Sequence, residues 1–303
     1  MQFFTKNTSL IIPTRNRPTQ LINLLNQLKS FKVEFFEILI IDSSNLFNKK
    51  ILKKKIKDFS VNIYHTRPST SLQRNHGLIK KNPKTKYVMF LDDDVVFFKD
   101  AFYEMNKTIY GYKKKIDIGC FGFNQIQNKD NGNLIERLKC SKIIKFLGIY
   151  SSRPGSVLKS GWHTKILNVK KNSYLDWMYT TACIYKSDVV KNLRFDQNLG
   201  QYSYLEDLDF SLKLKILKKK IIISHLSKFH HPHEIDRSSF LFGITEVINR
   251  YKIVKKYHLN TLFFFISIFL RFLISLFGIF KLNKNLLFRA LGNILGVIKC
   301  LKI

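Results

Sequence analysis

Cysteine is scarce in this chain of 303 residues, and its few copies are scattered. They form neither a Cys-x-x-Cys pair nor a Cys/His cluster with zinc spacing: Cys120, Cys140, Cys183 and Cys300. The sequence therefore indicates no disulfide framework and no structural zinc, and the cysteines are interpreted as free thiols in a reducing compartment. The amino-terminal residues also lack the basic-then-apolar order of a signal peptide, which predicts a cytoplasmic location for the bulk of the chain.

Acidic residues are also few. Lys and Arg number 52 against 21 Asp and Glu, so the formal net charge is +31. A field of this strength attracts polyanions, which include nucleic acid, anionic lipid and phosphorylated substrates. No signature of an RRM, KH, zinc-finger or helix-turn-helix domain accompanies the charge, which argues against a specific nucleic-acid partner. The sequence also lacks a Gly-rich, Lys-bearing phosphate loop near the first apolar run, which argues against a nucleotidyltransferase.

The chain does contain a regular alternation of strand-like and helical stretches. Apolar runs of strand length lie at 9–12, 36–41, 61–65 and 87–91, with helical patterns between them at 21–28, 49–57 and 71–80. This alternation predicts an α/β domain with a mostly parallel sheet, right-handed crossovers and flanking helices. In such sheets ligands bind beyond the carboxyl ends of the strands.

The pattern continues later in the chain after an interruption. Strands are predicted at 117–123, 176–186 and 221–224, and a helix is predicted within 195–219. Residues from about 124 to 175 are polar, basic and weakly periodic, so they are interpreted as a variable insertion. The α/β domain is therefore expected to span residues 1–236.

Carboxylates gather at the predicted carboxyl ends of the strands. Asp42 ends the second apolar run, and Asp92, Asp93 and Asp94 follow the fourth. Three adjacent acids repel one another, so they need a compensating cation or strong hydrogen bonds. Oxygen ligands at a strand end suit Mg²⁺ or Mn²⁺, which usually also hold substrate phosphates. A solvated acidic turn is the alternative, and the location of Asp42 at the same edge favours a functional site.

Residues 237–303 differ in composition from the rest of the chain. They hold 11 Lys and Arg residues against one acid, Glu246, and an apolar run at 262–280 that Arg271 divides. A spanning helix needs about 20 apolar residues, and a central Arg opposes insertion. We favour helices lying in the membrane interface, held by apolar faces and by attraction to anionic lipid. A buried helical cap on the α/β domain and a true membrane span are the alternatives.

Taken together, the ordered motifs resemble those of a family 2 glycosyltransferase with the GT-A fold. The matching segments run in the family's order over residues 8–236: SLIIPTRNRP, EILIIDSS, QRNHGL, YVMFLDDDV, YLEDLDFSLKL and a histidine-rich stretch. The resemblance implies an inverting enzyme that takes a sugar from a UDP-, GDP- or dTDP-sugar with the help of Mn²⁺ or Mg²⁺. Such an enzyme has to stabilise a departing diphosphate and deprotonate an acceptor hydroxyl.

For the metal, the resemblance assigns Asp92-Asp93-Asp94 to the family's Asp-x-Asp signature. By that match Asp94 is the direct ligand, Asp92 faces the ribose or the metal's water shell, and Asp93 is the ambiguous middle position. One histidine of His230, His231 and His233 would serve the metal or the diphosphate, and His231 is preferred.

For the nucleotide, the resemblance assigns the loop at Pro13, Thr14 and Arg15, together with Asp42 and Arg74. A carboxylate can accept from a base N–H or a ribose hydroxyl, and the planar fork of an arginine can meet the base or a phosphate oxygen. The family usually has a second acid after Asp42, and this chain has Ser43 there. For Arg74 the alternative is an ordinary residue on a helix surface.

For catalysis, the resemblance assigns Asp207 as the general base and Glu206 as a neighbour that orients the acceptor. Acids in a first helical turn also suit the helix dipole, so ordinary capping is the alternative. Asp176 and Trp177 lie where relatives line the acceptor pocket. A core position for Trp177 is equally compatible with the sequence.

The sequence thus predicts a glycosyltransferase that acts on a polysaccharide or lipid-linked acceptor, peripheral on the inner face of an anionic membrane. The alternative is a basic nucleic-acid- or membrane-binding protein without catalysis. A non-catalytic scaffold is opposed by the joint presence of Asp92, Asp94, Glu206 and Asp207.

Overall fold

The computed structural model describes residues 4–45, 53–54, 56–57, 59–127, 150–200, 202–232, 239–277 and 284–302. They belong to two compact units. The first, here called the sheet unit, comprises Met1–Gln127 and Ile166–His233, and the second, the helical unit, comprises Asn128–Lys165 and Glu234–Ile303. The division differs from the sequence-based boundary at residue 236, because the helical unit also includes part of the predicted insertion.

The sheet unit is built on a mixed sheet. Its described strands are β1 (Thr8–Thr14), β2 (Glu37–Asp42), β3 (Asn62–His65), β4 (Tyr87–Leu91), β5 (Val96–Phe97), β6 (Ile118–Gln125), β7 (Ser173–Leu175), β8 (Ala182–Lys186) and β9 (Lys220–His230). Their order is β3-β2-β1-β4-β8-β6-β9-β5, with β7 paired to β9. Strands β1 to β4 are parallel, β8 is antiparallel to both β4 and β6, and β6 is parallel to β9. The predicted α/β class is confirmed.

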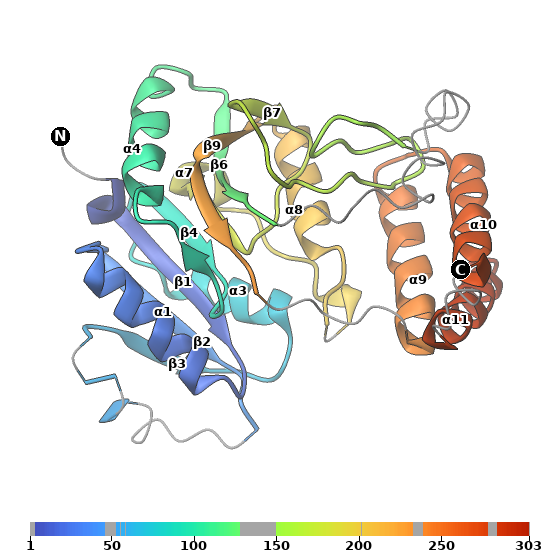
Figure 1. Cartoon of the computed structure of the whole chain (residues 1–303), viewed down its shortest axis with the longest axis horizontal. Helices are drawn as coiled ribbons and strands as arrows, with labels where there is room; N and C mark the ends of the chain where they lie inside the picture. The colour runs from blue at the N-terminus through green and yellow to red at the C-terminus, as the bar shows by residue number, and fades with distance from the viewer. Residues whose placement is uncertain are drawn as a thin grey trace. The chain divides into compact units, whose positions relative to one another are not determined.

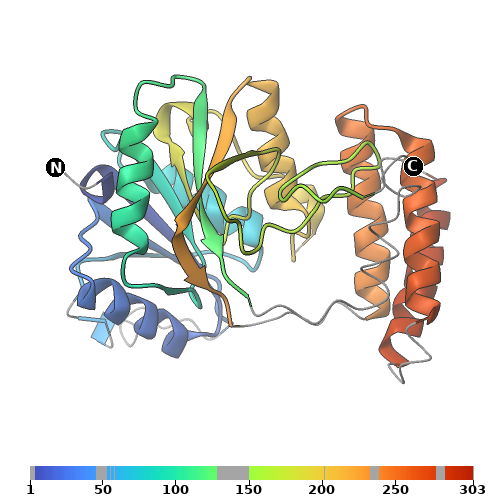
Figure 2. The ribbon, with the colours of Figure 1, turned by 45° about the horizontal axis from the view of Figure 1, so that its top comes forward.

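Helices cover both faces of this sheet (Figures 1 and 2). They are α1 (Pro18–Ser30), α3 (Thr70–Lys80), α4 (Ala101–Gly111), α7 (Ser187–Val190) and α8 (Glu206–Ile216), with 3₁₀ turns at Phe4–Asn7 and Gln197–Leu199. Helix α1 begins with Pro18, whose fixed φ suits the first helical position and whose missing N–H costs nothing there. Its leucines are spaced to bury one face: Leu21, Leu24, Leu25 and Leu28.

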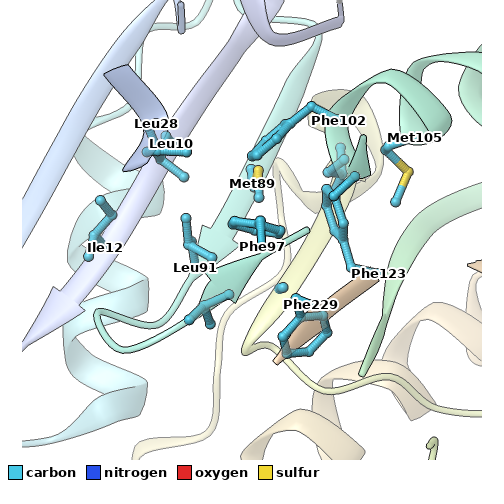
Figure 3. Close-up of a cluster of buried hydrophobic side chains, with 14 of the residues drawn as sticks. Leu10, Ile12, Leu28, Met89, Leu91, Phe97, Phe102, Met105, Phe123 and Phe229 are labelled. Carbon is cyan, nitrogen blue, oxygen red and sulfur yellow. The ribbon is translucent and has the colours of Figure 1, made fainter. Parts of the chain in front are cut away.

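The strand residues alternate between two hydrophobic layers. Leu10, Ile12, Met89 and Leu91 join the core beneath α1 and α4, which also contains the rings of Phe97, Phe102, Phe123 and Phe229 (Figure 3). The residues between them face the other side: Ile11 meets Gly77 of α3, and Phe90 packs edge-on against Phe210 of α8. Because the side chains alternate with a period of two, a shift in the register of β1 or β4 by one residue would move its side chains from one layer to the other.

Some predicted elements have different bounds in the structure. The strand expected at 176–186 forms only at Ala182–Lys186. The preceding residues are an irregular buried segment, because the side chain of Met178 fills the space beside Gly122 of β6 and its N–H donates to Ser211 Oγ at 3.1 Å. The final strand is longer than expected and reaches His230. The helix expected at 49–57 lies mostly outside the described residues.

The helical unit contains α9 (Phe240–Lys256), α10 (Thr261–Phe277) and α11 (Lys284–Cys300) (Figure 2). A Cβ on Gly292 would meet the backbone oxygen of Phe240, so α9 and α11 approach each other closely. The loop at 150–165 packs on these helices: Arg250 Nη1 donates to Gly161 O at 2.6 Å, and its guanidinium lies 4.1 Å from the centroid of the Trp162 ring. These contacts explain why the loop belongs to this unit.

Among the described helices, none is long and apolar enough to cross a membrane. Helix α10 covers most of the apolar run, and it has 17 residues with Arg271 near its middle.

The described cysteines are buried free thiols: Cys120, Cys183 and Cys300. Cys140 lies outside the described residues.

Candidate active site

The predicted site residues of the sheet unit meet at the carboxyl edge of the parallel strands. Thr14 and Asp42 are the last residues of β1 and β2 and are paired in register. Asp92, Asp93 and Asp94 directly follow β4, which is the other neighbour of β1. The start of α8, which carries Glu206 and Asp207, reaches the same edge through the side-chain contacts described next.

Arg74 connects the end of β4 with the start of α8. It extends from α3 and is 3% exposed. Its Nη2 donates to Asp92 Oδ1 at 2.8 Å, and its Nη1 forms an ion pair with Glu206 Oε1. Thr180 Oγ1 also donates to that oxygen of Glu206, at 3.0 Å. The terminal nitrogens of Arg74 thus contact two carboxylates of the chain, so its role in this structure is to fix Asp92 and Glu206.

Glu206 lies in a strongly desolvated position. Burial raises the pKa of its carboxyl group to about 8, in spite of the opposing charge of Arg74, and the neighbouring charge of Asp207 acts in the same direction as burial. The pKa of Arg74 is also raised: burial alone would lower it, but the charges of Glu206 and Asp92 outweigh that effect.

The three acids in the first turn of α8 have different environments. Glu206 is bound to Arg74, and Asp209 is 1% exposed and pairs with Lys213 Nζ at 2.8 Å. Asp207 is half-buried, and its Oδ1 accepts the N–H of Leu208 at 2.8 Å. Of these acids, Asp207 is the one whose exposure suits contact with an acceptor molecule.

Asp93 is held beneath the loop that follows β1. Thr14 Oγ1 donates to its Oδ2 at 2.6 Å, and Arg17 Nη1 lies 3.4 Å from its Oδ1. Burial raises the pKa of Asp93 to about 6, against the hydrogen bond from Thr14 that lowers it. The ambiguous middle acid of the triplet thus joins the β1 loop to the β4 loop.

Asp94 contacts a cationic or imidazole nitrogen on each oxygen. Arg17 Nη1 donates to Oδ2 at 2.8 Å, and His231 Nε2 lies 2.8 Å from Oδ1. Burial disfavours the imidazolium form of His231, but the hydrogen bond to Asp94 and the charges of Asp94 and Asp92 raise its pKa. His230 is exposed and contacts the carbonyl oxygen of Ile126 at 3.2 Å, and His233 lies outside the described residues.

The candidate nucleotide residues are organised by hydrogen bonds at the strand ends. Asp42 is 6% exposed and its Oδ1 accepts the N–H of Ser44 at 2.7 Å, which closes a local turn. Gln73 Nε2 donates to the carbonyls of Thr14 and Ile41, at 2.8 and 2.7 Å, and fixes the ends of β1 and β2 to α3. Arg15 is exposed and its Nη2 donates to Asn45 Oδ1 at 3.3 Å. Pro13 is a buried residue of β1.

Gln73 and Arg17 are site residues that the sequence analysis did not single out. Both lie inside quoted motifs, QRNHGL and PTRNRP, so position within a motif was the available signal. Trp177, by contrast, is 1% exposed and packs edge-on against Tyr179, with ring centroids 4.6 Å apart. Its packing corresponds to the core alternative.

The donor set at this edge fits a divalent cation that is shared with a substrate. In the described parts of the chain, no group of three or more His, Cys, Asp and Glu side chains is arranged to hold a metal by itself. Asp94 and His231 form an adjacent pair, with Asp92 two residues away in the sequence. Mg²⁺ and Mn²⁺ commonly take one or two carboxylates and complete their shell with phosphate oxygens and water. The chemistry of these ligands suits that arrangement.

The fold places the chain in a recognised structural class. A mannosyltransferase from Pyrobaculum calidifontis, solved with GDP-Man and Mn²⁺, aligns with a TM-score of 0.55 over 95% of this chain and 87% of its own, at 11% sequence identity. GalNAc-T7, solved with UDP, GalNAc and Mn²⁺, aligns with a TM-score of 0.57 over 82% of this chain and 47% of its own, at 15% identity. The fold is therefore GT-A, as the sequence predicted.

Sequence comparison gives the family. The model of glycosyl transferase family 2 matches residues 9–172, which is more than half of the chain, and the chain belongs to that family. A curated relative, the minor teichoic acid biosynthesis protein GgaB of Bacillus subtilis (strain 168), is 24% identical over 253 residues. The match covers 78% of this chain but only 24% of GgaB, so the chain spans about a quarter of that relative's length. The predicted family is confirmed.

Proposed function

We propose that the sheet unit transfers a sugar from a nucleoside-diphosphate sugar to a hydroxyl group of a polysaccharide or lipid-linked acceptor, with metal assistance and inversion. The observation that carries the proposal is the contact of Asp94 with His231 at the carboxyl edge, to which Arg74 also joins the start of α8 with its half-buried Asp207. This arrangement provides one site for a metal-bound diphosphate and one acid for the acceptor.

The residues divide the reaction between them. Asp94 and His231 would hold a divalent cation, with Asp92 as a third oxygen source, and the cation would neutralise charge on the departing diphosphate. Asp207 accepts the proton of the acceptor hydroxyl as that oxygen attacks the anomeric carbon. The bond from this carbon to the diphosphate breaks on the opposite face, so the anomeric configuration inverts. Arg74 positions Asp92 and Glu206 relative to each other throughout.

The donor would bind along the ends of β1 and β2. Pro13, Thr14, Arg15 and Asp42 are the residues we assign to the nucleoside, in the segment that Gln73 fixes in place. The similar GT-A structures contain UDP and GalNAc with Mn²⁺ in one case and GDP-Man with Mn²⁺ in the other. The name of GgaB refers to teichoic acid, which makes a cell-envelope polymer the acceptor class we favour.

We further infer that the helical unit binds an anionic membrane surface on its cytoplasmic side. Helix α11 presents apolar side chains that are 44–53% exposed at three- and four-residue spacing: Phe288, Leu291, Ile294 and Ile298. The sequence from residue 237 onward has Glu246 as its single acid. An apolar helix face in a strongly basic region suits a headgroup layer of opposite charge. Such binding would keep the sheet unit near a lipid-linked acceptor.

The assay that tests the transfer activity follows the release of nucleoside diphosphate from UDP-, GDP- and dTDP-sugars. Polyprenyl-diphosphate-linked sugars and poly(glycerol phosphate) would serve as acceptors, with Mn²⁺ present. We expect Asp207→Asn to lower kcat about 100-fold or more, the usual contribution of a general base, while donor affinity is retained. Asp188→Asn, which alters an exposed acid on α7, is the matched control and should leave kcat unchanged. Full transfer by the Asp207→Asn variant would overturn the assignment.

A further inference from the structure

Arg17 is a cation built into the proposed metal site, and its backbone is fixed from both sides. It immediately precedes α1, where Pro18 occupies the first helical position and Arg17 O accepts the N–H of Leu21 at 3.1 Å. The preceding residue, Asn16, has a φ of 55° and is joined to the β2 loop: its N–H donates to Ser44 Oγ at 2.7 Å, and its Oδ1 accepts the N–H of Asn45 at 3.2 Å. The chain therefore presents Arg17 at one defined place.

The side chain of Arg17 is directed to the carboxylates and makes no capping hydrogen bond to α1. Its Nη1 lies 2.8 Å from Asp94 Oδ2 and 3.4 Å from Asp93 Oδ1. His231 Nε2 contacts the other oxygen of Asp94, Oδ1, so each oxygen of that carboxylate already has a nitrogen atom as its neighbour. A metal that binds Asp94 has to use the same oxygens, so Arg17 and the metal compete for them.

Exposure decides which partner is able to move. The side chain of Arg17 is 43% exposed, whereas those of Asp93 and Asp94 are each 5% exposed. The guanidinium can leave Asp94 by rotation about its own side-chain bonds, without disturbing the fixed backbone or the carboxylates. Once displaced, it remains next to the site where the diphosphate is proposed to bind, and a guanidinium suits phosphate oxygens well.

We propose that the guanidinium of Arg17 is the counterion of Asp94 in the nucleotide-free enzyme, in place of the metal. When donor and metal bind together, the guanidinium moves from Asp94 to the diphosphate. In the free enzyme it offsets the repulsion among adjacent carboxylates and weakens metal binding. The diphosphate gives Arg17 a new partner, so nucleotide strengthens metal binding, and by linkage the metal strengthens nucleotide binding equally. Arg17 therefore couples the two ligands. This inference rests on the proposed function of the site.

The test measures Mn²⁺ affinity directly, from the loss of the electron paramagnetic resonance signal of free Mn²⁺ during titration of the full chain. We expect Arg17→Gln to bind Mn²⁺ about fivefold more tightly than the unaltered protein without nucleotide, which is the size expected for loss of a competing, partly exposed ion pair. With UDP or GDP present, the enhancement of Mn²⁺ affinity by nucleotide should fall in this variant by at least the same factor.

Three further variants separate the outcomes. Arg17→Lys keeps the charge and should retain weak Mn²⁺ binding without nucleotide. Arg194→Gln removes the same charge from a guanidinium that donates to the carbonyls of Lys191 and Leu193, and it should match the unaltered protein. Asp94→Asn should abolish specific Mn²⁺ binding.

Equal or weaker Mn²⁺ binding by Arg17→Gln, with binding lost in Asp94→Asn, would overturn the counterion role and leave the metal site intact. A tightening of the same size in Arg194→Gln would also overturn it, because net charge alone would then explain the effect. Unchanged Mn²⁺ binding in Asp94→Asn would overturn the proposed metal site, and the role of Arg17 with it.

Discussion

Arg74 joins two parts of the site that are far apart in the sequence. It is buried and joins Asp92 of the β4 loop to Glu206 of α8. We expect Arg74→Met to lower the free energy of unfolding by about 1–3 kcal/mol, because it removes the buried hydrogen-bond donor that Asp92 and Glu206 share. Urea denaturation measures this loss. Arg15→Met, on an exposed arginine of the same site, is the matched control and should change stability by less than about 0.5 kcal/mol. Equal stability of the two variants would contradict the linking role of Arg74.

The desolvation of Glu206 predicts a pH dependence of stability. Its folded-state pKa of about 8 exceeds its ordinary value of 4.5. Between these two values the folded state holds a proton that the unfolded state has released, so the unaltered protein loses stability as pH rises through this window. Glu206→Gln cannot ionise and escapes that loss. Its stability relative to the unaltered protein should therefore increase from pH 5 to pH 8, as measured by urea denaturation at several pH values.

Glu34→Gln provides the control for this titration, because the Glu34 side chain is 74% exposed and pairs with Lys6 at the surface. Its stability difference from the unaltered protein should vary little with pH. If Glu206→Gln were less stable than the unaltered protein by the same amount at every pH, Glu206 would be ionised beside Arg74 throughout, and the predicted pH dependence would be wrong.

At the residue scale, the sequence predicted the acids better than their partners. Asp94 and Asp92 were identified because three adjacent carboxylates at a strand end demand compensation. The compensating groups are Arg17, Arg74 and His231, which come from loops and helices far apart in the sequence. Arg17 was missed because an arginine in a polar loop of a chain with 52 cations carries no signal of its contact. The parallel pairing of β1 with β4 brings the loops after these two strands, and with them Arg17 and Asp94, to the same edge of the sheet.

At the scale of elements, the packing of α9 on α11 depends on glycine. A Cβ on Gly292 would meet the backbone oxygen of Phe240, and neither backbone can yield without moving its helix. We expect Gly292→Ala to destabilise the helical unit by about 1–3 kcal/mol, since an overpacked contact forces the helices apart. Thermal unfolding followed by circular dichroism at 222 nm measures this effect.

Gly111→Ala is the contrasting substitution. Gly111 is the last residue of α4, and a Cβ there would meet nothing within 4 Å. Because alanine is the better helix former, this variant should be neutral or more stable by up to about 1 kcal/mol. Equal destabilisation by both alanines would contradict this prediction, because the α9–α11 contact could then not explain the loss of stability in Gly292→Ala.

Elements with strong periodicity were predictable, and those defined by tertiary contacts were not. Strand β4 was predicted with its observed bounds because Tyr87–Leu91 is an apolar run cut off by charge. The segment at 176–181 has the apolar content of a strand, but Met178 fills the space that Gly122 leaves on β6. The short strands β5 and β7 were missed, because strands of two and three residues carry too little pattern to be recognised.

At the scale of the whole molecule, the net charge of +31 is compatible with the anionic surface that we propose as a partner. We expect the full chain to sediment with vesicles containing phosphatidylglycerol and to bind much more weakly to neutral phosphatidylcholine vesicles. Leu291→Glu should lower the partition coefficient roughly tenfold or more, since burial of a leucine in lipid is worth about 1.5–3 kcal/mol.

Leu226→Glu is matched to this variant in exposure, because Leu226 and Leu291 are both 46% exposed and Leu226 lies on β9 of the sheet unit. It introduces the same charge and should reduce vesicle binding far less. If Leu226→Glu and Leu291→Glu reduced vesicle binding equally, net charge alone, and not the exposed apolar side chains of α11, would hold the protein at the membrane.

The central claim is that the carboxyl edge of the sheet binds a metal–nucleotide pair through Asp94. The most direct measurement is the thermal stability of the purified chain with UDP, GDP or dTDP, with and without Mn²⁺. The account predicts that one diphosphate with Mn²⁺ stabilises the fold, by about 2.7 kcal/mol at a hundredfold excess over Kd, and that Asp94→Asn abolishes this gain. Absence of stabilisation by all three diphosphates, or a gain that persists in Asp94→Asn, would contradict it.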